Sequence, residues 1–193
     1  MTVAEPARSV QGSRMLRRWP TAFGVVFAAS LIAAYWFGFA DTERMSQVLT
    51  AAGFIYLGAA ALGLRTSAWP LFALTIVLIT VGFFMRAFDP FWWMLGIAGV
   101  LVAVGLARGS WRPLWGMPLA FGAMALIAAI AIVASLLGQP WAAMLVAAGL
   151  LAHAAWDVFH HRTGRVVVRS LAEFCAVLDS LLAVGILAAA LLG

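Results

Sequence analysis

The sequence predicts an all-α integral membrane protein with seven transmembrane helices in one bundle. Of its 193 residues, 65% are hydrophobic and only 10% are charged, whereas soluble domains carry about 25% charged residues. A chain of this composition cannot cover a water-facing surface, so lipid must be its solvent. The long runs of Ala, Leu, Val and Ile lack the alternation of a β-barrel strand, and they therefore favour helices.

The hydrophobic segments give the individual helices, because a helix needs about 20 apolar residues to span a bilayer. The expected spans are residues 21–40, 46–65, 69–87, 91–107, 115–138, 141–159 and 170–192. Prolines in several short connections are expected to start the next helix. The longest connection, 162–170, carries a turn signal at Thr163–Gly164. Residues 1–18 are polar and predict a cytoplasmic leader, with residues 19–193 as the transmembrane domain.

The arginines predict the orientation of these spans. The chain has no lysine, so arginine carries its net charge of +5. With a cytoplasmic N-terminus, only Arg44 and Arg86 fall on the outer side, and all other arginines fall on the inner side. This positive-inside pattern predicts an N-in, C-out protein. The Ala-, Arg- and Gly-rich composition is typical of a GC-rich genome, so we expect the cytoplasmic (inner) membrane of a bacterium.

The same composition excludes several classes of function. Without lysine the chain cannot form a retinal Schiff base, hold pyridoxal phosphate through an imine, or build a Walker-type phosphate loop. The arginines lie at span ends and form no basic helix, so no nucleic-acid partner is expected. The single cysteine, Cys175, excludes an intramolecular disulfide and is expected to be a packing residue.

Ionisable residues concentrate in the segment 151–165. It contains every histidine of the chain, His153, His160 and His161, together with Asp157. At positions i, i+4, i+7 and i+8 of a helix, Asp157 and the two later histidines share one face with His153. His153 is expected about 12 Å deeper in the membrane than His161, at 1.5 Å per residue.

The last span is expected to add further ionisable groups to this cluster. A short connection makes spans six and seven antiparallel neighbours. Asp179 then lies at a depth similar to that of His153, and Glu173 lies near the level of Asp157 and His160. Because ionisable groups inside a membrane are costly, they usually face the bundle interior and often mark a functional site.

The first interpretation of this cluster is a metal-dependent enzyme that acts on a lipid-like substrate. Imidazole and carboxylate groups are ligands of zinc and of non-haem iron. An open coordination position on such an ion would activate water close to the lipid headgroups. The candidate metal ligands are His153, Asp157, His160 and His161, and the candidate catalytic residues are Asp179 and Glu173.

Two other interpretations stay open. His153 and Asp179 are typical of a proton or ion relay in a transporter. Alternatively, the two aspartates pair with His153 or Arg169 and only pin the helices together, as in a structural or accessory subunit of another membrane protein. Tyr56, in the middle of span two, is expected to be a packing residue, with a hydrogen bond toward the cluster as the alternative. Expected partners are membrane lipid, a lipid-like substrate or a membrane subunit.

Overall fold

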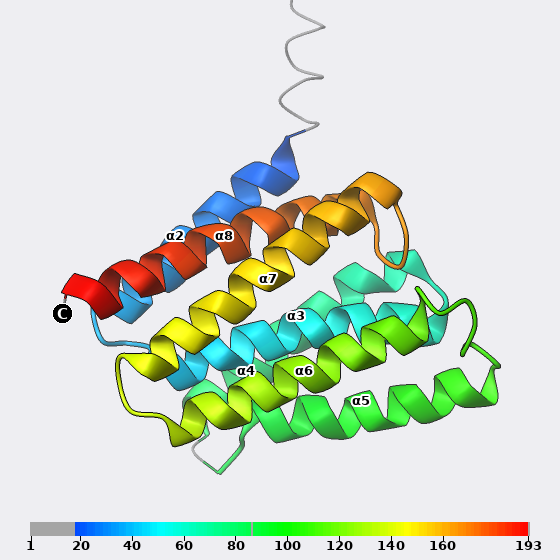
Figure 1. The fold of residues 1–193 in the computed structure, drawn as a ribbon, viewed down its shortest axis with the longest axis horizontal. Coiled ribbons are helices and arrows are strands. Elements are labelled where there is room, and N and C mark those ends of the chain that lie inside the picture. Colours follow the sequence, from blue (N-terminus) through cyan, green and yellow to red (C-terminus); the bar gives the residue numbers. More distant parts are fainter. Residues whose placement is uncertain (1–17, 86, 193) are drawn as a thin grey trace, which may run out of the picture.

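A computed structural model describes residues 18–85 and 87–192, and this part of the chain folds into a bundle of long helices joined by short connections (Figure 1). The prediction for the leader falls almost entirely outside these residues, as does Arg86, so both stay predictions. The elements are α2 Trp19–Trp36, α3 Thr42–Leu62, the 3₁₀ turn η1 Arg65–Ser67, α4 Ala68–Phe84, α5 Pro90–Ala107, α6 Met117–Leu136, α7 Trp141–Thr163 and α8 Arg169–Leu192.

Local capping sets several helix ends. The Asp41 carboxylate accepts a hydrogen bond from the Arg44 backbone N–H at 2.9 Å, which begins α3. Asp89 does the same for Phe91 at 2.9 Å at the start of α5, where Pro90 is the first helical residue. Helices α3 and α7 end at glycines in the left-handed conformation, Gly63 with φ 64° and Gly164 with φ 62°.

The all-helical prediction is confirmed for the described residues, and each predicted span corresponds to one helix. Seven of the described helices are long and apolar enough to cross a membrane. The largest differences are of four residues each: α2 ends at Trp36 instead of residue 40, and α3 begins at Thr42 instead of residue 46. Helix α7 continues past its predicted end at residue 159 to Thr163. Its last turn therefore includes His160 and His161. The N-in, C-out orientation and the bacterial inner membrane stay predictions.

The bundle is organised around α3, which runs through its middle in Figure 1 and contacts α4, α5, α6 and α7. Polar side chains of α3 are buried, including Ser46, Gln47 and Thr50. The surrounding helices instead expose large apolar side chains, such as Phe84 on α4 and Leu126 on α6. Apolar groups outside and polar groups inside are the arrangement that a lipid solvent favours.

Helix α8 lies between α2 and α7, as the top of Figure 1 shows, and packs extensively on both. Gly24 permits the close approach of α2, because a Cβ atom at that position would lie 2.8 Å from the backbone oxygen of Phe174. The expectation that spans six and seven pack as antiparallel neighbours is confirmed. Their packing brings the ionisable residues of α7 against those of α8.

Candidate functional site

The ionisable residues that meet inside the bundle are His153, Asp157 and Asp179, here called the His–Asp triad. His153 and Asp157 lie one turn apart on α7, and Asp179 faces them from α8. The Nδ1 atom of His153 is 3.1 Å from Asp157 Oδ2 and 2.8 Å from Asp179 Oδ2. These side chains are 5%, 0% and 1% exposed respectively. One imidazole nitrogen therefore bridges two carboxylates on two helices, out of reach of solvent.

Helix α3 contributes a further group to the triad. The Tyr56 hydroxyl donates a hydrogen bond to Asp157 Oδ1 at 2.6 Å. Asp157 is thus held through both carboxylate oxygens, one by Tyr56 and one by His153. The preference for Tyr56 as a mere packing residue is wrong, and the alternative of a hydrogen bond toward the cluster is what the structure shows. A sequence signal existed, because the span that contains Tyr56 also contains Ser46, Gln47 and Thr50.

The remaining predicted site residues make their hydrogen bonds elsewhere. His160 donates through Nδ1 to the backbone oxygen of Trp156 at 2.9 Å, and its ring packs against Tyr56 with the ring centroids 4.9 Å apart. His161 bonds the backbone oxygen of Arg169 at 3.1 Å. Glu173 accepts a hydrogen bond from the Thr21 hydroxyl and so links α8 to α2. The structure brings none of these three side chains into the triad.

The triad has the donor atoms and the charge that a divalent metal ion needs. One ligand atom from each of the three residues lies within 4.8 Å of the others. With both carboxylates ionised, the cluster would carry excess negative charge even beside a protonated imidazole, and such a charge is costly in an apolar interior. A divalent cation would neutralise it. Tyr56 would hold one of the metal ligands in position, because its hydroxyl bonds Asp157 Oδ1 and leaves Oδ2 free for the ion.

The second nitrogen of His153 is unusual. Nε2 is buried and has no hydrogen-bond partner among the described residues. Buried polar atoms in folded proteins are nearly always paired. Nε2 lies at the edge of the imidazole opposite the one that contacts the carboxylates, and His153 also lines a groove between α6 and α7. The sequence offered no signal for this arrangement.

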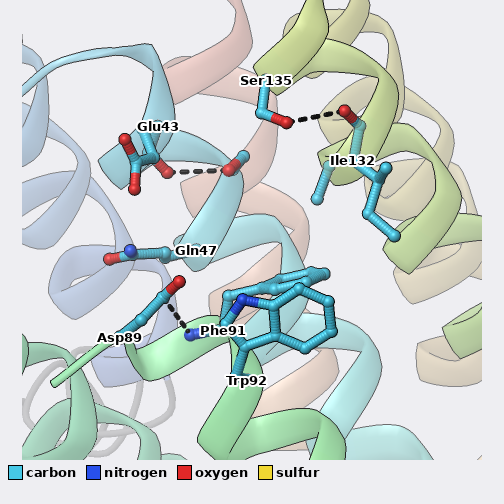
Figure 2. A pocket seen from close by; sticks show the side chains of 9 residues that line it. Glu43, Gln47, Asp89, Phe91, Trp92, Ile132 and Ser135 are labelled. Carbon is cyan, nitrogen blue, oxygen red and sulfur yellow. Dashed lines mark hydrogen bonds between the residues drawn. The ribbon is translucent and has the colours of Figure 1, made fainter.

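A separate cavity of about 200 Å³, lined by both polar and apolar residues, lies among α3, α5 and α6, at the N-terminal end of α3. Figure 2 shows Glu43, Gln47, Asp89 and Ser135 around it. Its hydrogen bonds are local, since Asp89 caps α5 and the Ser135 hydroxyl bonds the Ile132 backbone oxygen at 2.7 Å. Asp89 and Ser135 thus make local bonds within their own helices, and Gln47 accepts a hydrogen bond from Arg44 one turn away. The residues of this cavity do not converge on one point as those of the His–Asp triad do, so the triad is the stronger candidate site.

Comparison with protein-family models, with curated proteins and with solved structures finds no match for this chain. The chemistry of the triad is therefore argued from its own atoms.

Proposed function

We propose that the protein is an integral membrane metalloprotein that binds one zinc or iron ion at His153, Asp157 and Asp179 and acts as an enzyme on a lipid-like substrate. The observation that carries the proposal is the convergence of three buried donor groups within 4.8 Å. Imidazole together with carboxylate suits both metals. Three protein ligands leave coordination positions free, as in catalytic zinc sites.

Each residue of the site has a separate part in this proposal. His153 and Asp157 present their donor atoms from one face of α7, and Asp179 completes the set from α8, so metal binding would lock the two helices together. Tyr56 orients the Asp157 carboxylate from α3. When bound, the ion supplies Lewis-acid chemistry by polarising an oxygen of the substrate. A lipid-like substrate fits because the site lies among helices whose outer surfaces are apolar.

A proton relay is the second candidate function, and a specific arrangement favours it. Tyr56, Asp157, His153 and Asp179 form an unbroken series of hydrogen bonds across three helices. A histidine flanked by carboxylates is the typical element of such a relay. The relay predicts proton movement in reconstituted vesicles and requires no metal, so the metal content separates the two candidates.

Metal analysis tests the proposed function. The protein is purified in mild detergent without a histidine tag, and its zinc and iron are measured together with those of His153→Ala and Asp179→Asn. We expect about one ion per chain in the parent protein and at least a tenfold loss in both variants, since ligand removal abolishes a three-ligand site.

His161→Ala and Glu173→Gln serve as matched controls, because each removes an ionisable group of the same helices that bonds elsewhere. Both should keep the metal of the parent protein. Metal at background level in the parent protein would contradict the proposal, and so would a full complement of metal in His153→Ala. Proton flux through vesicles would then be the next measurement.

A further inference from the structure

A groove of about 380 Å³ runs between α6 and α7, and it is lined almost entirely by apolar residues. Its volume falls within the range of small-molecule sites, about 300–1,000 Å³. Small residues line it on both sides: Gly122 and Ala123 lie on α6, and Gly149 and Ala152 lie on α7. A Cβ atom at Gly122 would meet no other atom within 4 Å, so that position borders free space.

His153 is the ionisable residue among those that line the groove. Its Nδ1 atom is held by the two carboxylates, while the buried Nε2 atom has no partner within the described part of the chain. A buried nitrogen left unpaired carries a free-energy cost, because it has lost its hydrogen bond to water and gained none in return. A ligand in the groove that offers one hydrogen-bonding group would remove this cost. The groove thus complements a molecule with an apolar body and a single polar head.

The position of His153 along α7 restricts the charge of that head. At 1.5 Å per residue, His153 lies about 18 Å from Trp141 and about 15 Å from Thr163, the two ends of α7. The hydrocarbon core of a bilayer is about 30 Å thick, so His153 lies near its middle. A charged headgroup reaches that depth only at a high free-energy cost. The head of the ligand must therefore be uncharged.

The metal site restricts the head further. With Nδ1 bound to an ion, the neutral imidazole carries its hydrogen on Nε2, which makes Nε2–H a donor. The head must then present an acceptor oxygen.

The length of the groove indicates the apolar part of the ligand. The groove extends along α6 from Pro118 to Ile130, about 18 Å at 1.5 Å per residue, which accommodates a long extended hydrocarbon chain.

We propose that the α6–α7 groove binds an uncharged long-chain lipid with a carbonyl oxygen, and that this oxygen accepts a hydrogen bond from His153 Nε2–H. The inference rests on the proposed function, because it names the substrate class of the same site and takes the tautomer of His153 from metal binding at Nδ1. The carbonyl would lie beside the metal-bearing imidazole, with its hydrocarbon chain against Leu119, Leu126 and Ile130.

The test is photolabelling of the purified, metal-containing protein. The probe is a long-chain aliphatic ketone with a diazirine on its tail, and the reference probe is the corresponding alkane without the carbonyl. We expect the ketone to bind about fivefold to tenfold more tightly than the alkane, which corresponds to one net hydrogen bond of about 1 kcal/mol. The labelled peptides should come from α6 and α7.

Gly122→Leu is the variant that fills the groove without touching the triad, and it should weaken ketone labelling at least tenfold while the bound metal stays unchanged. Gly99→Leu on α5 is the matched control, because a Cβ atom there also meets nothing within 4 Å, yet Gly99 lies outside the groove. This control should label as the parent protein does. Thermal unfolding of both variants verifies that they fold.

The two proposals fail in different ways. A protein without bound metal overturns the proposed function before any lipid is added. A protein that holds its metal but binds the ketone no better than the alkane overturns the groove inference alone. Equal labelling of Gly122→Leu and the parent protein does the same.

Discussion

Asp157 is the most constrained side chain of the site at the scale of single residues. It is 0% exposed, and each of its carboxylate oxygens has a defined partner, Tyr56 at Oδ1 and His153 at Oδ2. Buried carboxylates are tolerated only when they are paired in this way. The hydroxyl of Tyr56 is therefore a positioning group for the triad and has no contact with a reacting atom in our proposal.

Replacing Tyr56 by phenylalanine should both destabilise the protein and weaken metal binding. The variant leaves Asp157 Oδ1 buried without its donor, which costs about 1–3 kcal/mol of unfolding free energy. Loss of a residue that hydrogen-bonds a metal ligand typically lowers metal affinity about 10–100-fold. Thermal unfolding in detergent and a competitive metal titration measure the two effects.

Tyr35→Phe is the control for this prediction. The Tyr35 hydroxyl bonds Thr42 in a partly buried position away from the triad, so its loss should leave metal affinity unchanged. Equal metal affinity in Tyr56→Phe and the parent protein would contradict a positioning role for Tyr56.

The close packing of α2 against α8 matters at the scale of secondary-structure elements. Helix α8 holds Asp179 in place, and it is itself held by α7 on one side and by α2 on the other. The contact with α2 depends on Gly24 beside the backbone of Phe174, on the hydrogen bond from Thr21 to Glu173, and on the bond from Trp36 to the Gly185 oxygen at 3.0 Å. Glu173 thus acts in helix packing.

Gly24→Ala should separate α2 from α8 and lower stability. Its new Cβ atom would lie 2.8 Å from a backbone oxygen that cannot move without shifting α8. Overpacking of this kind costs about 1–3 kcal/mol. The measurement is the thermal unfolding midpoint in detergent.

Gly99→Ala on α5 is the matched substitution for this contact. Nothing lies within 4 Å of its new Cβ atom, so higher helix propensity should stabilise it by up to about 1 kcal/mol. If both alanine variants unfold at the same temperature, close approach at Gly24 does not hold α2 against α8.

The orientation of the bundle in its membrane is the question at the scale of the whole molecule. The arginine distribution predicts a cytoplasmic N-terminus. In that orientation the η1 turn and the end of α7 lie inside, whereas the α6–α7 connection lies outside. The only native cysteine, Cys175, is buried, so engineered cysteines report the orientation cleanly once it is replaced.

In intact bacterial cells that express the Cys175→Ala background, a membrane-impermeant maleimide should label Gly138→Cys but not Thr66→Cys. Both positions are exposed in the structure and lie in connections on opposite sides of the bundle. Thr66→Cys should react only after the cells are permeabilised. The reverse pattern would show that the N-terminus faces outward.

The sequence alone was sufficient to locate the helices and to predict one contact between them, that of α7 with α8. Span length and hydropathy depend on local composition, so the seven helices could be located, with errors mainly at ends such as that of α7, which Gly164 sets. The short connection before α8 made α7 its neighbour, and so Asp179 could be expected near His153.

Only the tertiary structure decided which side chains form the triad. Helical periodicity places His153, Asp157, His160 and His161 on one face, but it does not say which neighbouring helix each side chain meets. His160 packs against Tyr56 and bonds its own backbone, whereas His153 faces Asp179. The recruitment of Tyr56 and the groove that His153 lines depend on how the helices pack around α3, and packing between distant segments leaves no periodic signal in the sequence.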